Sequence, residues 1–212
     1  MTAPFPSELS RITEFTLAGA AVTAKEIEEV CRKVREQKLY GVCVPGSRVE
    51  LVASLLDDTD LKVTALIGGP LGTPDGDVKR YETEVAIDFG AQEIEVYLNA
   101  GRLKDSDHKS VLRELRDIAE AADERTVKVH LPTRLLTPEE IEIGCGLISE
   151  SGAHFVCTTF ATVEDIKLFR AAVGPKFGVK AENPALDEKA ARALVEAGAT
   201  RLGVFAGFPP AS

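Results

Sequence analysis

Several residues that can carry acid–base or nucleophilic chemistry fall inside apolar, strand-like segments of this chain. Lys180 lies in GVKA (178–181), and Glu95 lies in EIEVYLN (93–99). A lysine inside an apolar strand either pairs with a carboxylate or has a lowered pKa that makes its amine a nucleophile. For Lys180, an ion pair with Glu95 or Glu182 and a catalytic role are equally well supported by the sequence, so both interpretations stay open.

Two further residues of this chemistry lie in neighbouring strand-like segments. Cys157 can act as a thiolate beside Lys180, but a cysteine in a strand is more often a small buried hydrophobic residue. His130 is expected at a hydrogen-bonded interior or rim position, because no second histidine lies near it in the sequence. Without a pair of histidines or cysteines at ligand spacing, the sequence predicts no metal site and no cofactor.

The segments that must position these residues alternate between two types along the chain. Amphipathic, helix-like segments such as 22–37, 108–123 and 137–152 separate short apolar segments. The strand-like segments are 14–17, 39–44, 62–68, 93–99, 127–133, 154–160, 176–182 and 200–205. Strict alternation implies a parallel sheet, and eight units favour a closed barrel over a doubly wound sheet. We predict an α/β fold, a single (β/α)8 TIM barrel over residues 1–212, with frayed tails at 1–10 and 208–212.

In such a barrel, residues near the C-terminal ends of the strands form the mouth, and alternate residues point inward. Lys180 and Glu95 are therefore the candidate catalytic residues. The residues expected to surround a ligand are Glu14, Thr16, Cys43, Asn99, His130, Thr159 and Glu182, although Cys43 also fits a core position. Lys128 opens its strand, and we expect it to extend toward the opposite mouth.

Composition and charge exclude several classes of function. The net charge of −9 and the pI near 5.0 disfavour nucleic-acid binding, because the field of the protein repels polyanions. No apolar run approaches the roughly 18 residues of a membrane span, and the first residues lack the pattern of a signal peptide. Four isolated cysteines fit free thiols in a reducing compartment. We therefore expect a cytoplasmic protein with neither a membrane nor a nucleic-acid partner.

The motifs of this chain resemble those of the deoxyribose-phosphate aldolase family from Ile12 to about Gly207. The matching segments are GVCVPGSRVEL (41–51), IGGPLGTPDGDVKRYETEVAIDFGAQEIEV (67–96), NAGRLKDSD (99–107), LLTPEE (135–140), ATVEDIKLFRAAVG (161–174) and GVKA (178–181). The resemblance implies a lysine Schiff-base aldolase that cleaves 2-deoxyribose 5-phosphate into acetaldehyde and glyceraldehyde 3-phosphate. It also implies a small carbonyl or sugar-like ligand, no cofactor, and a homodimer.

The family's active residues carry over only in part. Lys180 matches the second active-site lysine, which lowers the pKa of the Schiff-base lysine in the family. Glu95 stands where the family has a proton-transferring aspartate, and Glu14 replaces the aspartate of the opening strand. The Schiff-base position reads Cys157 here. A thiol can add to an aldehyde, but the adduct has no cationic nitrogen to accept electrons during carbon–carbon cleavage.

The three segments that hold phosphate in the family also differ. The loop after Thr159 is shortened, Glu182-Asn183-Pro184 replaces Ser-Gly-Gly, and the last strand ends in 203–206, GVFA, instead of serines. A carboxylate repels phosphate, and proline has no N–H to donate. We therefore expect the family's cleavage to be absent or very weak. The alternatives are an aldolase that uses Lys180 on an unphosphorylated carbonyl compound, a non-catalytic ligand-binding or assembly protein, and Cys157 chemistry with His130.

Overall fold

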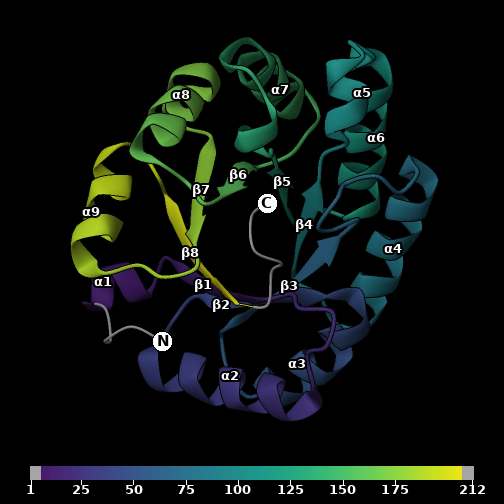
Figure 1. Ribbon diagram of the computed structural model, residues 1–212. Helices are drawn as coiled ribbons and strands as arrows, with labels where there is room; N and C mark the ends of the chain where they lie inside the picture. The colour runs from purple at the N-terminus through teal and green to yellow at the C-terminus, as the bar shows by residue number, and fades with distance from the viewer. Residues whose placement is uncertain (1–5, 207–212) are drawn as a thin grey trace.

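Eight parallel strands close into a barrel with helices around its outside (Figure 1). The structure, a computed structural model, describes residues 6–206. The strands are β1 (Thr13–Leu17), β2 (Gly41–Pro45), β3 (Lys62–Ile67), β4 (Glu93–Tyr97), β5 (Thr126–His130), β6 (Phe155–Thr159), β7 (Gly178–Asn183) and β8 (Arg201–Ala206). Each pairs with the next along the chain, and β8 pairs with β1. The predicted (β/α)8 TIM barrel is confirmed, with all eight strand-like segments in their predicted places.

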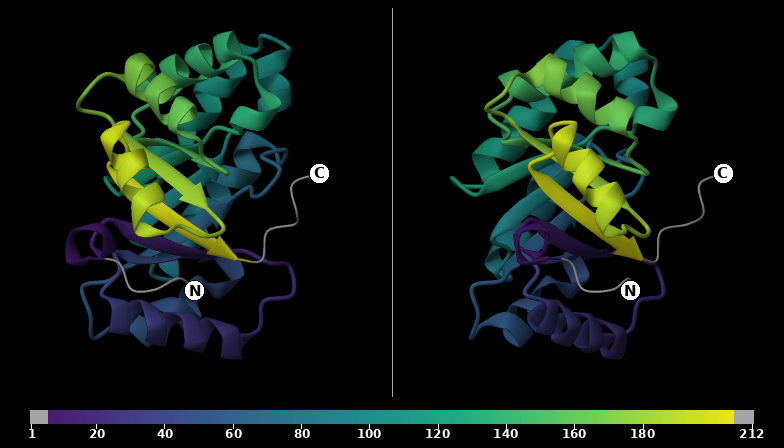
Figure 2. Two further views of the ribbon diagram at one scale, coloured as in Figure 1. Left: turned by 60° about the vertical axis from the view of Figure 1, so that its left-hand side comes forward. Right: turned by 90° about the vertical axis from the view of Figure 1, so that its left-hand side faces the viewer.

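Helices follow the strands and form the outer layer, which the views in Figure 2 show from the side. They are α1 (Ser7–Ser10), α2 (Ala24–Gln37), α3 (Val49–Leu56), α4 (Gly76–Asp88), α5 (Ala100–Lys104), α6 (His108–Ala121), α7 (Pro138–Glu150), α8 (Val163–Val173) and α9 (Glu188–Glu196), with 3₁₀ turns η1 (Gly46–Arg48) and η2 (Thr133–Leu135). Thr23 and Thr137 each cap a helix in a capping box. Gly90 and Gly198 end helices at φ of +100° and +118°, where a side chain would be strained.

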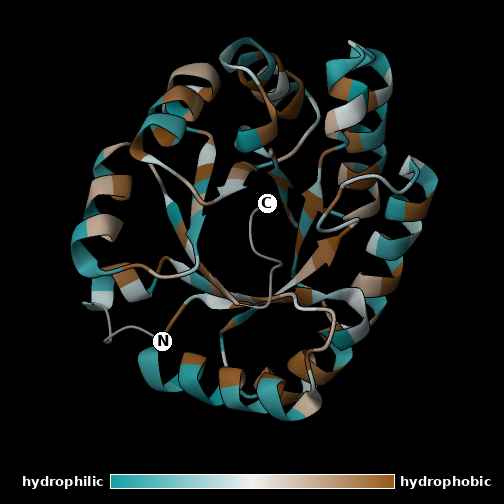
Figure 3. Cartoon of the chain, in the orientation of Figure 1, coloured by the Kyte–Doolittle hydropathy of each residue, from teal (hydrophilic) through white to brown (hydrophobic). Residues whose placement is uncertain are grey.

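The hydrophobic core lies between the barrel and the helices, while the interior of the barrel is largely polar. Along β4, Ile94 and Val96 point outward into the core, whereas Glu93 and Glu95 point inward. The helices turn their hydrophobic faces toward the strands, as α2 shows in Figure 3. Because burial of the outward faces stabilises the barrel, the inward faces are free to carry charged residues.

The N-terminal segment differs from its prediction. We expected residues 1–10 to be frayed, but Ser7–Ser10 form α1, with Leu9 and Ser10 buried. The hydroxyl of Thr13 donates a hydrogen bond to the carbonyl of Leu9 at 2.7 Å. This bond connects α1 to β1. The predicted tail 208–212 lies outside the described residues. Within residues 6–206, no helix combines the length and the apolar character that a bilayer crossing needs.

Candidate active site

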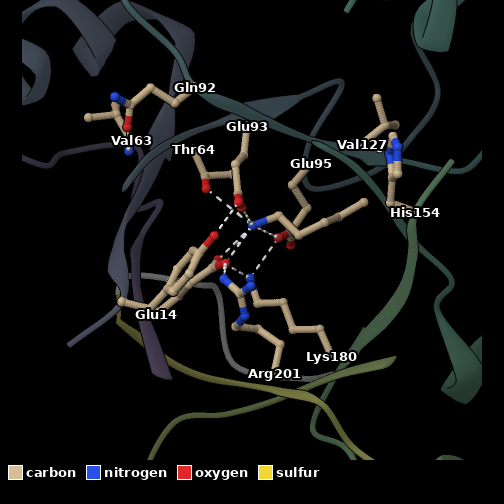
Figure 4. Close-up of polar contacts among 12 residues, drawn as sticks. Glu14, Val63, Thr64, Gln92, Glu93, Glu95, Val127, His154, Lys180 and Arg201 are labelled. Carbon is tan, nitrogen blue, oxygen red and sulfur yellow. Dashed lines mark hydrogen bonds and ion pairs between the residues drawn. The ribbon is translucent and has the colours of Figure 1, made fainter. Parts of the chain in front are cut away.

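A network of paired charges, which we call the barrel charge cluster, fills the interior of the barrel (Figure 4). Its acidic members come from β1, β4 and β7, and its basic members come from β5, β7 and β8. The members are Glu14, Glu93, Glu95, Lys128, Lys180, Glu182 and Arg201. Charges removed from water in this way are tolerated only when each meets an opposite charge and hydrogen-bond partners.

Lys180 is surrounded by three carboxylates. Its Nζ lies 2.6 Å from Glu95 Oε2, 2.7 Å from Glu14 Oε2 and 2.9 Å from Glu182 Oε1. Burial by itself would lower the pKa of Lys180, but the attraction of these carboxylates outweighs it and raises the pKa well above its ordinary value. The ion-pair interpretation of Lys180 is confirmed, with Glu95 and Glu182 both as partners. The amine is therefore held as an ammonium group near neutral pH.

Lys128 occupies a second centre of the cluster, deeper toward the N-terminal ends of the strands. Its Nζ lies 2.6 Å from Glu14 Oε1, 3.0 Å from Glu93 Oε2 and 3.1 Å from Thr64 Oγ1. Lys128 lies toward the opposite mouth, as expected, but it does not reach the rim, because its side chain is fully buried. A carboxylate pair inside the barrel offers the ammonium group stronger partners than the rim would.

Glu14 joins the two lysines and also meets Arg201, whose Nη1 lies 3.0 Å from Glu14 Oε1. Burial raises the pKa of a carboxyl group, but Lys128, Lys180 and Arg201 together lower the pKa of Glu14 far below its ordinary value. Both carboxylate oxygens are occupied by cations. Glu14, predicted to contact a ligand, is thus the electrostatic centre of the cluster.

Sequence reasoning missed Arg201, Glu93 and Tyr40. The guanidinium of Arg201 lies 3.3 Å from the centroid of the Tyr40 ring, and the Tyr40 hydroxyl donates to Glu93 Oε1 at 2.5 Å. The sequence contains a signal for two of these residues, Glu93 and Arg201. Glu93 precedes the inward-facing Glu95 by two residues, and Arg201 precedes Gly203 by two. Stepping by two along each strand would have placed both in the barrel interior.

His130 on β5 pairs with Cys157 on β6, and Cys157 in turn pairs with Lys180 on β7. Burial lowers the pKa of His130 to about 4 and raises the pKa of the Cys157 thiol well above its ordinary value. His130 Nε2 accepts the backbone N–H of Thr159 at 3.0 Å, and its ring stacks on Tyr97 at 4.2 Å between centroids. A neutral imidazole and a protonated thiol make thiolate chemistry at this place unfavourable.

The other predicted ligand residues divide between the cluster and its surroundings. Thr16 donates to Glu182 Oε1 at 2.7 Å, and Gly203 leaves the space that Glu182 fills, since a Cβ there would lie 2.4 Å from Glu182 Cγ. Cys43 is buried in a small apolar cluster with Leu66 and Tyr97. Asn99 lies apart from them, because its side chain caps α5 by accepting the N–H of Arg102.

A pit of about 60 Å³ opens at the mouth of the barrel above this apolar cluster. Its lining comes from the ends of β1 to β4, the loop after β3 and helix α4: Ala18, Pro45, Leu66, Gly69, Pro70, Glu82 and Tyr97. Gly69 is needed there, because a Cβ at this position would lie 2.8 Å from the Tyr97 ring. Tyr97, which lines the pit, follows Glu95 by two residues on β4 and therefore lies one layer above it.

Three potential metal ligands, Glu14, Cys43 and Glu95, place one donor atom each within 4.8 Å of one another. Glu14 and Glu95 already bind Lys180, so a cation would meet an ammonium group at the same oxygens. Burial also raises the pKa of the Cys43 thiol well above its ordinary value. These residues therefore do not fit a divalent cation.

Removal of the central carboxylate is expected to destabilise the fold strongly. In Glu14→Gln, the amide keeps the size of the side chain but leaves Lys128, Lys180 and Arg201 short of one negative charge, which should cost about 3–5 kcal/mol of unfolding free energy. Glu36→Gln breaks the exposed Arg32–Glu36 pair and should cost at most about 0.5 kcal/mol. Chemical denaturation at pH 7 measures both, and equal losses would contradict the central role of Glu14.

Buried His130 predicts a dependence of stability on pH. With a pKa of about 4 in the folded chain against 6.5 when unfolded, the unfolded state binds the extra proton between these values. Stability should therefore be full above pH 6.5 and fall as the pH drops toward 4, by up to about 3 kcal/mol from this residue. Denaturation of His130→Phe, which retains an aromatic ring beside Tyr97, should show a shallower slope in this window. An unchanged slope would refute the assignment.

Comparison with known proteins places this barrel among the aldolases. The deoxyribose-phosphate aldolase of Alkaliphilus oremlandii is 40% identical over 205 residues, covering 93% of this chain and 92% of the relative. That of Exiguobacterium sibiricum is 43% identical over 207 residues, covering 94% of each. The solved aldolase QR15 has a TM-score of 0.89 at 30% identity, covering 94% of this chain and 92% of its own. No family model matches. With such identity over nearly its whole length, the chain belongs to the deoxyribose-phosphate aldolase family.

Proposed function

We propose that this chain is a family member in which cleavage of 2-deoxyribose 5-phosphate is absent or very weak. The observation that carries the proposal is the enclosure of Lys180 by Glu14, Glu95 and Glu182 at 2.6–2.9 Å. Imine formation requires a neutral amine, and three carboxylates hold this one protonated. In the barrel as it stands, Lys180 is an electrostatic partner and not a nucleophile.

Cys157 supports the same conclusion. It stands where the resemblance puts the Schiff-base lysine, and the strand register sets it beside Lys180. Its buried thiol is protonated near neutral pH, because burial raises its pKa. Even a thiol adduct would lack the cationic nitrogen that draws electrons from the breaking carbon–carbon bond.

The electrostatics of β7 also argue against a phosphorylated substrate. Glu182 places a carboxyl group at the mouth-side end of the strand, and Pro184 follows it without an N–H to donate. Lys180, the nearest cation, is already matched by three carboxylates. A phosphate at this place would meet negative charge with no free positive charge to balance it.

A second candidate is an aldolase in which Lys180 attacks an unphosphorylated carbonyl compound with Glu95 as acid or base. Its support is Glu95 Oε1, a buried carboxylate oxygen beside Lys180 that has no hydrogen-bond partner among residues 6–206. This mechanism requires Lys180 to lose a proton, which its carboxylate partners oppose. A third candidate, a ligand-binding protein without catalysis, needs no such step and fits the closed ion pairs better.

The proposal is tested with purified protein and two measurements. Release of acetaldehyde from 2-deoxyribose 5-phosphate, followed by coupled reduction with NADH, should stay near the enzyme-free rate. Incubation with acetaldehyde and borohydride, followed by mass spectrometry, should leave Lys180 without a reduced adduct. Cleavage at the rate of an ordinary family member would refute the proposal, and an adduct on Lys180 would favour the second candidate.

Restoring an amine on β6 should restore imine formation. In Cys157→Lys, the new amine would lie beside the Lys180 ammonium, which lowers the pKa of a neighbouring amine. Acetaldehyde and borohydride should then yield an adduct on residue 157, while Cys157→Met, of similar length without an amine, should yield none. Cleavage of the phosphorylated pentose should remain weak in Cys157→Lys, because the phosphate segments are unchanged.

We further propose a homodimer that associates through α4. Val78 and Tyr81 lie one turn apart on this helix and are 57% and 66% exposed, so they form an apolar pair on its surface. A second copy packed antiparallel against this face would bury the apolar side chains of both helices. Arg80 and Glu84 already pair within the helix at 2.8 Å, so they need no partner in that copy. A cytoplasmic location is proposed as well, in keeping with four free, buried cysteines.

Sedimentation measures the proposed association. Unaltered protein should sediment with twice the mass of the 22.7 kDa chain, and Tyr81→Asp should shift it to the monomer, because a buried unpaired carboxylate is costly. Leu135→Asp introduces the same charge at another exposed apolar residue, far along the chain, and should leave the dimer intact. A monomeric parent protein would refute this proposal.

A further inference from the structure

Within residues 6–206, five buried side-chain polar atoms of the barrel interior have no hydrogen-bond partner. One is Nε of Arg201, whose guanidinium lies over the Tyr40 ring. The other four are Glu95 Oε1, Tyr97 Oη, His130 Nδ1 and Glu182 Oε2. The side chains of these four residues are at most 4% exposed. Buried polar groups are nearly always hydrogen-bonded, because leaving one unpaired costs free energy. Four unsatisfied atoms in one interior therefore point to an occupant that bonds to them.

The strand register brings these residues together. Tyr97 pairs with His130, His130 with Cys157, and Cys157 with Lys180, in a row across β4 to β7. Glu95 precedes Tyr97 by two residues and Glu182 follows Lys180 by two, so both carboxyl groups flank the row on its inward face. Burial raises the pKa of Tyr97 well above its ordinary value, and the nearby charges of Glu182 and Glu95 act in the same direction.

The four atoms offer donors and acceptors together. His130 Nε2 accepts the N–H of Thr159, so in the neutral ring Nδ1 carries the hydrogen and is a donor. The Tyr97 hydroxyl is a second donor. Glu95 Oε1 is an acceptor, and Glu182 Oε2 accepts when ionised and donates when protonated. The group whose hydrogen bonds match this set is a hydroxyl, which donates and accepts at once.

The charge of the site selects against anions. Lys180, the cation nearest to the row, is matched by three carboxylates, and the barrel charge cluster contains four acidic and three basic side chains. We propose that the row of Tyr97 and His130, flanked by Glu95 and Glu182, binds a small neutral molecule with several hydroxyl groups and no phosphate. This inference rests on the proposed function, because it takes the barrel interior as a ligand site that no longer holds phosphate.

A ligand of this size has a route to the site. Tyr97 lines the pit at the barrel mouth and also begins the row, so it connects the solvent-facing side to the interior. Small polyols such as glycerol have the hydroxyl groups that the row can bond.

Glycerol and glycerol 3-phosphate test the inference without any carbonyl chemistry. Titration of ¹⁵N-labelled protein with glycerol should produce saturable shifts of the Thr159 amide, which donates to His130, with half-saturation in the millimolar range. Glycerol 3-phosphate should bind at least about tenfold more weakly, because it brings an unbalanced negative charge.

Tyr97→Phe should weaken glycerol binding about threefold to tenfold, the effect of losing one hydrogen bond. His130→Phe removes the other donor and should act in the same direction.

Tyr81→Phe makes the same substitution at an exposed tyrosine and should leave glycerol binding unchanged. A dispersed amide spectrum establishes that each variant is folded before it is titrated. Shifts that stay linear with glycerol concentration, binding unaffected in both variants of the row, or equal binding of glycerol 3-phosphate would overturn the inference. Normal cleavage of 2-deoxyribose 5-phosphate would refute the proposed function by itself, whereas absent cleavage without glycerol binding would refute only this inference.

Discussion

The ion pairs of Glu14 with Lys128, Lys180 and Arg201 are the constraint on which the interior of this barrel depends. Seven charged side chains occupy a space that in other barrels is filled by branched aliphatic residues. Each would be costly alone, since desolvation of an unpaired ion amounts to several kcal/mol. The arrangement is stable because one carboxylate bridges both lysines, and because the outward faces of the strands supply an ordinary hydrophobic core.

The same pairing determines which chemistry the barrel can perform. A Schiff-base aldolase needs an amine that loses its proton near neutral pH, usually with the help of a nearby cation. Here Lys180 has three anions as neighbours and Cys157 has no amine. The family fold is retained, but the protonation equilibrium of Lys180 favours the ammonium form. The proposed role without covalent chemistry rests on this equilibrium.

Two glycines show that the changed residues fit together sterically. Glu182 occupies the space that a Cβ on Gly203 would need, and the Tyr97 ring occupies the space beside Gly69. In a close-packed interior, a larger side chain is accommodated only where its neighbour is small. Glu182 and Tyr97 are therefore packed members of the interior, and each has one polar atom without a hydrogen-bond partner in the described part of the chain.

The sequence by itself determined the alternation of strands and helices, the closure into eight units and the helix caps at Thr23 and Thr137, because these follow from local periodicity and capping chemistry. It also brought Lys180, Glu95 and Glu182 to the barrel interior. Only the tertiary structure decided that Lys180 is enclosed, that Lys128 is fully buried in ion pairs and that Arg201 joins them. Those outcomes depend on side chains from strands up to 187 residues apart meeting at one point, and no local pattern records such a meeting.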